Sequence, residues 1–179
     1  MHRGLLIVFL LFALLPSTIK SAFSSCSQFS NRNVDAVYGS GDSEAMIILS
    51  FNDSYDFNFI YRFNKSSTGK EAIKHICQNN AKFHCYFSHG NSVLHAIGFD
   101  QNGDGFNSDN DHFPHNDIYL SGWHDNGYWS YWILNQPLSD NEEGQWKFSS
   151  LGFEKRKLKN CDMDAWFWFD NFIERRPSF

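Results

Sequence analysis

Residues 57–80 read FNFIYRFNKSSTGKEAIKHICQNN, and the hydrophobic period of this stretch changes from that of a strand to that of a helix. In FNFIYRF the aromatic residues stand at every second position, which is typical of a β-strand with one buried face. Thr68 and Glu71 then have the spacing of a capping box, and the apolar residues from Ala72 to Cys77 lie along one side of a helix. A short helix with a narrow apolar stripe needs a larger surface to pack on. The stretch therefore predicts a strand and a helix, about 68–80, packed on a sheet.

Other strand-like runs surround this stretch. They are residues 45–51, 82–88, 92–99, 118–124, 128–135, 145–153 and 164–172. Short turns predict three hairpins: the run 45–51 with FNFIYRF, the two runs around Gly90, and the two runs around Asn126–Gly127. The Asn-Gly pair supplies the positive φ angles that a tight turn requires. The prediction is an α+β domain with a mostly antiparallel sheet, one packed helix at about 68–80 and an inserted acidic loop at about 100–117.

The N-terminal segment has the order of a secretory signal peptide. A positively charged start, MHRG, precedes the apolar run LLIVFLLFALL and the small-residue stretch STIKSAFSS. The apolar run is shorter than the roughly 20 residues of a membrane-spanning helix, and a retained anchor is the alternative. We therefore expect a secreted, extracellular protein without stable membrane insertion. Its expected parts are a signal peptide (1–21), an N-terminal extension (22–43), one domain (44–172) and a C-terminal tail (173–179).

In an exported protein, cysteines can form disulfides and Asn-x-Ser sequons can be glycosylated. An even number of cysteines in an oxidising compartment predicts two disulfides, and a zinc site is a weaker alternative because no CxxC pair occurs. The cysteines are Cys26, Cys77, Cys85 and Cys161. Their pairing cannot be deduced from the sequence, but nearness favours Cys77 with Cys85, which would leave Cys26 for Cys161. Asn52 and Asn64 begin Asn-x-Ser triplets and are candidate glycosylation sites.

The acidic stretch DQNGDGFNSDND, residues 100–111, matches the twelve positions of a calcium-binding loop. Calcium prefers six to eight oxygen ligands, and Gly105 stands at position six, where the chain must turn sharply. The predicted ligands are Asp100, Asn102, Asp104, the carbonyl group of Phe106, Ser108 and Asp111. Because a strand leads into the loop, we expect a lone structural calcium site of the weak extracellular kind; the alternative is a surface turn that binds nothing.

Residues beyond the calcium-like loop allow a second metal chemistry. Three histidines beside the acidic residues could bind zinc, copper or haem, although loop histidines that bind nothing are the alternative. They are His112, His115 and His124.

Asp162, Asp164 and Asp170 could also supply a carboxylate pair for glycoside hydrolysis, but the sequence does not give their separation. No nucleophile elbow, His-Glu-x-x-His or Walker motif occurs, so an enzyme is the less favoured interpretation.

Aromatic residues make up 18% of the chain, and they concentrate in the run YWSYW. Alternation puts Tyr128 and Trp132 on one face of the strand, and Trp129 and Tyr131 on the other. One pair is then expected in the core, while the other pair is available on the surface to bind a ligand together with Trp123. The alternative is that all of these rings fill the core.

The order of YRFNKSSTGKEAIKHI, SVLHAIGF, GYWSYWILN, GQWKFSSLGFEKRKL and DAWFWF resembles that of secreted bacterial proteins that typically end in cell-envelope sorting signals. It is also similar to the β-grasp domain at the C-terminus of transcobalamin and intrinsic factor. The resemblance covers roughly residues 44–170, and YWSYW is its most specific part. It implies a β-grasp fold and a role in holding a ligand. The lone EF-hand-like DxNxDG loop is not part of the shared plan, so cobalamin binding is not expected.

These features together predict a secreted, monomeric, non-catalytic domain. One structural calcium ion would organise the acidic loop beside an aromatic surface for a small ligand, glycan or protein partner. The alternative is a secreted metal-dependent hydrolase that uses the acidic and histidine-rich loop. A formal net charge of -5 without a basic stripe excludes nucleic acid as an expected partner.

Overall fold

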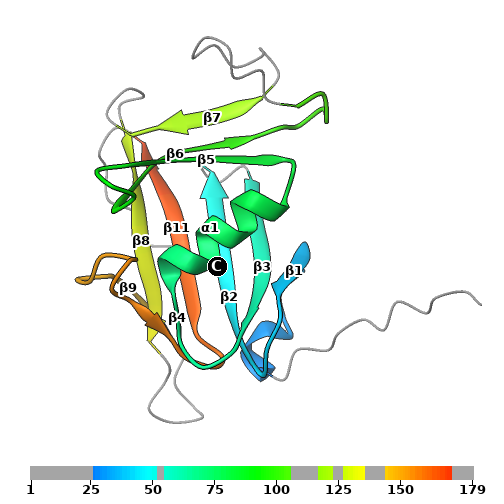
Figure 1. Cartoon of the computed structure of the whole chain (residues 1–179), viewed down its shortest axis with the longest axis vertical. Coiled ribbons are helices and arrows are strands. Elements are labelled where there is room, and N and C mark those ends of the chain that lie inside the picture. The colour runs from blue at the N-terminus through cyan, green and yellow to red at the C-terminus, as the bar shows by residue number, and fades with distance from the viewer. Residues whose placement is uncertain (1–25, 52–54, 106–116, 123–126, 136–143, 171–179) are drawn as a thin grey trace, which may run out of the picture.

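The computed structural model describes residues 26–51, 55–105, 117–122, 127–135 and 144–170 (Figure 1). Within these ranges the chain forms strands, one α-helix and one short 3-10 helix. In chain order they are η1 (Ser27–Phe29), β1 (Ala36–Gly39), β2 (Ser43–Phe51), β3 (Tyr55–Phe63), β4 (Ser67–Thr68), α1 (Gly69–Asn79), β5 (Phe83–Ser88), β6 (Val93–Phe99), β7 (Ile118–Ser121), β8 (Gly127–Asn135), β9 (Gln145–Phe148), β10 (Lys157–Leu158) and β11 (Met163–Asp170).

The strands form one large sheet and two small ones. The large sheet has the order β1-β3-β2-β11-β8-β9, a second sheet has the order β5-β6-β7, and β10 pairs with β4. All pairs are antiparallel except β1 with β3 and β11 with β2. Figure 1 shows α1 in front of the large sheet and the three-stranded sheet running across the ends of its long strands. The predicted α+β class with mostly antiparallel strands and a packed helix is confirmed, whereas the β-grasp arrangement stays a prediction.

Residues 57–80 form the strand and the helix that the sequence predicts, as β3 and α1. β2 and β3 form an antiparallel hairpin in which Ile47 faces Phe59. The Thr68 side chain accepts the N–H of Glu71, and the Glu71 side chain accepts the N–H of Thr68, so the capping box that starts α1 is present. The buried side of the helix contains Ala72, Ile73 and Ile76. The hairpin of β5 with β6 is confirmed as well.

The predicted hairpin of residues 118–124 with 128–135 is wrong. β7 instead pairs with β6 in the three-stranded sheet, and β8 lies between β11 and β9 in the large sheet. The physical reason is burial, because β8 carries large side chains on both of its faces. Such a strand is stable in the interior of a sheet that is covered on both sides. The predicted strand 145–153 is also shorter than expected, because β9 ends at Phe148.

The large sheet has a hydrophobic core on each face. On the face toward α1, the core includes Ile47, Phe59, Ile73, Trp129 and Trp166. On the opposite face, the core includes Phe29, Ile48, Ile60, Trp132 and Phe167. Consecutive residues of β2 and of β11 therefore enter different cores, as the period of a strand requires.

Two disulfides connect elements of the fold. Cys77 at the end of α1 is bonded to Cys85 in β5, with 5.9 Å between their Cα atoms. Cys26 is bonded to Cys161 with a Cα separation of 5.4 Å, and this bond joins the start of the described chain to the turn before β11. The predicted disulfides and the pairing that nearness favoured are confirmed. Among the described residues, no helix is both long and apolar enough to cross a membrane.

Candidate metal centre

The acidic loop joins the end of β6 at Phe99 to the start of β7 at Ile118. These strands are antiparallel, and the pair nearest to the loop joins Phe99 to Ile118. Asp100 follows Phe99 and Asp117 precedes Ile118, so the sheet places these two aspartates beside each other. The sheet therefore fixes one carboxylate at each end of the predicted 100–117 insertion.

Hydrogen bonds from backbone N–H groups to side-chain oxygens hold the first residues of the loop in a turn around Asp100. Its carboxylate accepts the N–H of Gly103 at 2.6 Å and the N–H of Gly105 at 2.9 Å. Both glycines have positive φ angles, 79° and 87°, which other residues rarely adopt. Asn102 Oδ1 accepts the N–H of Asp104 at 3.0 Å, and Asn102 Nδ2 donates to Asp104 Oδ2 at 2.9 Å. The turn buries Asp100, which is 3% exposed, and returns Asp104 toward it.

Three carboxylates converge here, and no side chain of the described residues forms an ion pair with them. One oxygen from each of Asp100, Asp104 and Asp117 lies within 4.8 Å of the other two, so the cluster could hold a metal ion. No lysine or arginine within the described ranges forms an ion pair with any of the three. Burial raises the pKa of Asp117, and the negative charges of Asp100 and Asp104 raise it further, while the N–H of Gln101 lowers it. A divalent cation would remove this repulsion.

Asp117 also has a buried carboxylate oxygen to which none of the described residues donates a hydrogen bond. Its Oδ1 accepts the N–H of Gln101 at 3.3 Å. Its Oδ2 is buried and has no hydrogen-bond partner among the described residues. A buried oxygen without a partner is unfavourable by about 1–3 kcal/mol, so such atoms usually contact a ligand, ion or water. This atom is an indication of a bound cation that is independent of the clustering of acidic residues.

The loop is anchored to two other parts of the fold. Gln101 Nε2 donates to the hydroxyl group of Tyr55 at the start of β3, at 2.7 Å. The N–H of Asp100 donates to the carbonyl group of Lys82, directly before β5, at 2.9 Å. A cation bound by the cluster would therefore stabilise the end of the three-stranded sheet and its contact with β3.

The structure brings together part of the predicted ligand set and adds one residue. Asp100 and Asp104 join the cluster, and Asn102 lies in the same turn. The predicted ligands Phe106, Ser108 and Asp111 lie outside the described residues, as do His112, His115 and His124. Asp117 was not predicted as a ligand, because it lies outside the twelve positions 100–111 and its place beside Asp100 follows only from the pairing of β6 with β7.

The predicted aromatic residues are mostly core residues. Trp129, Tyr131 and Trp132 are all buried, Tyr128 is half-buried, and Trp123 lies outside the described residues. The expectation that one of the two pairs lies on the surface is therefore wrong, because both faces of β8 are covered. Trp129 Nε1 donates to the carbonyl group of Leu120 at 2.9 Å, so this ring also joins β8 to β7.

The carboxylates considered for glycoside hydrolysis are not together in an open site. Asp162 and Asp164 are buried, and Arg156 Nη2 lies 2.8 Å from an oxygen of Asp162 and 3.4 Å from an oxygen of Asp164. The Tyr131 hydroxyl group donates to Asp164 as well. Asp170 is exposed at the end of β11. The two buried aspartates therefore belong to an internal ion-pair network.

Comparisons of the chain with known protein families, with characterised proteins and with solved structures find no match. The resemblance to the β-grasp domain of the vitamin carriers therefore stays a prediction. Function has to be argued from the chemistry and geometry of the chain itself.

Proposed function

We propose that this protein is an exported binding domain in which one calcium ion, held by the acidic cluster, organises the loop between β6 and β7. The observation that carries the proposal is the convergence of three carboxylates on a point where the buried Oδ2 of Asp117 has no other described partner. The two disulfides are compatible with export.

The chemistry of the cluster favours calcium over zinc. Structural zinc in proteins is bound mainly by cysteine and histidine, and all four cysteines are in disulfides. The residues that converge in the described part of the loop offer carboxylate oxygens, the ligands that calcium prefers. The remaining oxygens that calcium requires would come from the predicted ligands Phe106, Ser108 and Asp111. The loop would then shape the surface that meets a small ligand, glycan or protein partner.

Thermal unfolding with metal ions tests this proposal. After treatment with EDTA, calcium should raise the melting temperature of the mature protein, and the increase should grow with the calcium concentration. At a concentration of about 100 times Kd, binding stabilises the folded state by about 2.7 kcal/mol. Extracellular calcium modules have a Kd of about 0.1–1 mM, so the titration should extend to tens of millimolar.

Two variants assign the effect to the cluster. Asp117→Asn keeps the size of the side chain but removes a charge, and it should weaken the response to calcium. Asp170→Asn is the matched control, because Asp170 is exposed at the end of β11. A calcium response that Asp117→Asn leaves unchanged would show that the cluster is not the site.

The hydrolase alternative predicts a different response. Zinc, rather than calcium, would then stabilise the protein, and replacement of His112, His115 and His124 would remove the effect because a catalytic zinc needs nitrogen ligands. No response to either metal would contradict both interpretations of the loop.

A further inference from the structure

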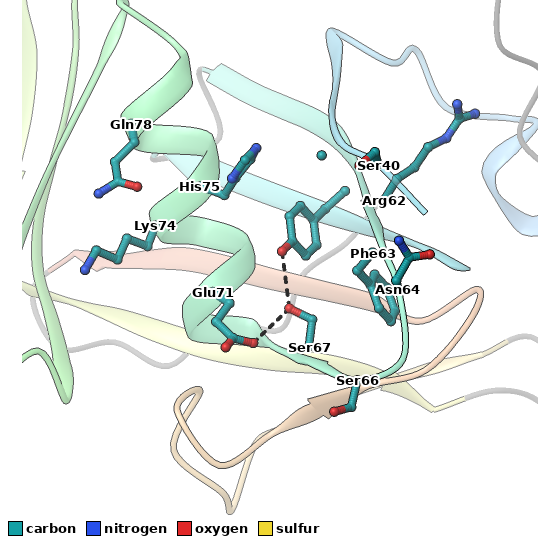
Figure 2. A pocket seen from close by; sticks show the side chains of 12 residues that line it. Ser40, Arg62, Phe63, Asn64, Ser66, Ser67, Glu71, Lys74, His75 and Gln78 are labelled. Carbon is teal, nitrogen blue, oxygen red and sulfur yellow. Dashed lines mark hydrogen bonds between the residues drawn. The ribbon is translucent and has the colours of Figure 1, made fainter. Parts of the chain in front are cut away.

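A polar groove lies between α1 and the ends of β1 and β3 (Figure 2). Its volume is about 540 Å³, which lies in the range of roughly 300–1,000 Å³ of sites for small ligands. Lys74 and Gln78 line the helix side of the groove, on the exposed face of α1. Ser40 and Asn64 lie on the opposite side in Figure 2.

Hydrogen bonds hold the floor of this groove in place. The hydroxyl groups of Tyr61 and Ser67 are 3.3 Å apart, and Ser67 Oγ donates to Glu71 Oε2 at 2.9 Å. The ring of Tyr61 also packs against that of His75, with 5.7 Å between the ring centres. Since Tyr61 and Ser67 are buried, the floor is a rigid surface of ring and hydroxyl groups.

The charges along the groove favour a neutral ligand. Arg62 is paired with Glu44, whose carboxylate lies 3.4 Å from its Nε atom. The charged groups that remain, Lys74 and Glu71, have opposite signs. The walls therefore offer hydrogen-bond donors and acceptors without a net charge, which is the chemistry that binds the hydroxyl and amide groups of sugars.

The sequon Asn64-Lys65-Ser66 stands in the turn between β3 and β4, at the side of the groove. Asn64 and Ser66 are exposed, and Lys65 has a φ angle of 61°, as a tight turn requires. Asn64 Oδ1 accepts the N–H of Asp42 at 3.3 Å. Asn64 Nδ2, the atom to which an N-linked glycan is attached, has no hydrogen-bond partner among the described residues.

We infer that Asn64 carries an N-linked glycan and that the first sugars of this glycan lie in the groove between α1 and β3. The donor is a lipid-diphosphate-linked oligosaccharide. Asn64 Nδ2 forms a bond with C1 of the first sugar, the bond from C1 to the diphosphate oxygen breaks, and Nδ2 loses one proton. The inference rests on the export that the proposed function includes, but not on the metal site.

Mass spectrometry of the secreted full chain tests the modification. The chain is expressed in a secretory host that attaches N-linked glycans, and its mass is measured before and after peptide N-glycosidase F. The wild type and Asn52→Gln should lose the mass of a glycan at position 64, whereas Asn64→Asp and Ser66→Ala should carry none there. Secreted protein without a glycan on Asn64 overturns this inference alone. Protein that stays unmodified inside the cell overturns it together with export.

Melting temperatures of matched variants test whether the glycan occupies the groove. Asn64→Asp contains the same residue that enzymatic release leaves behind, so it is the matched form without a glycan. The double change Lys74→Ala with Gln78→Ala is made in the glycosylated protein and in Asn64→Asp, at a fixed calcium concentration. It should lower the melting temperature of the glycosylated protein by about 2–4 °C more than it lowers that of Asn64→Asp. The control Lys155→Ala, at an exposed residue outside the groove, should show no such difference. Equal effects of the double change in both forms would overturn the placement of the sugars.

Discussion

Asp164 should make the protein less stable as the pH rises from 4 to 7. Its side chain is 0% exposed in β11. Burial is the largest influence and raises the pKa of Asp164 to about 6, although Arg156 and the Tyr131 hydroxyl group lower it. The ion pair and the hydrogen bond therefore offset only part of the cost of burying the negative charge.

The direction and size of the effect follow from the two protonation states. In the unfolded chain the pKa of Asp164 is close to its ordinary value of 3.8. Between that value and about 6, the folded state binds more protons than the unfolded state, so folding is favoured by low pH. This contribution is fully present below about pH 4 and is lost as the pH rises through 6. The difference between the two pKa values corresponds to about 3 kcal/mol.

The variant Asp164→Asn should remove this pH dependence. Asparagine has the same size and still accepts a hydrogen bond from Tyr131, but it has no charge to bury. Arg156 keeps Asp162 as its ion-pair partner at 2.8 Å. The variant should therefore be at least as stable as the wild type at pH 7, with a gain of up to about 3 kcal/mol.

Urea unfolding at pH 4, 5, 6, 7 and 8 measures the difference between the two proteins. Asp170→Asn is the control, since it removes an exposed carboxylate from the same strand and should leave the slope of the wild type unchanged. Loss of a strongly favourable buried ion pair would instead make Asp164→Asn less stable than the wild type by about 3 kcal/mol at pH 7. The attraction to Arg156 would then exceed the cost of burial, and the reasoning from the raised pKa would be refuted.

Two further predictions concern the fold, and urea unfolding checks both. Replacement of both cysteines by serine should cost about 5 kcal/mol for Cys26–Cys161, which are 135 residues apart, but about 2.5 kcal/mol for Cys77–Cys85, which are 8 apart. Equal costs would contradict an effect of loop length in the unfolded chain. Trp132→Ala should cost about 3–5 kcal/mol because this ring is 2% exposed, whereas Phe148→Ala, at 53% exposed, should change stability by less than about 1 kcal/mol. A small loss for Trp132→Ala would contradict its place in the core.

Local signals in the sequence were sufficient for the elements that contact their neighbours along the chain. The hairpin of β2 with β3 and the capping box of α1 depend on residues only a few positions apart. The nearness of Cys77 to Cys85 is of the same kind. In each case the hydrophobic period and the turn residues indicate the same structure, which makes a prediction from sequence reliable.

The errors arose where a distant segment decides the pairing. The Asn-Gly pair favoured a hairpin of β7 with β8, but β8 pairs with β11, where Trp132 faces Ala165. No short sequence motif predicts this pairing, because β8 is buried on both faces only once the whole sheet is assembled. The omission of Asp117 has the same cause, since it meets Asp100 only through the register of β6 with β7.

The high aromatic content is explained by the sheet itself rather than by a binding surface. Trp166, Phe167, Trp168 and Phe169 alternate between the two cores along β11. A sheet covered on both faces needs large side chains on both, so a small domain of this kind is rich in buried aromatic residues. The search for a binding partner should therefore begin with polar features rather than with the tryptophans. Among the described residues, these features are the cluster of Asp100, Asp104 and Asp117 and the neutral groove beside Asn64.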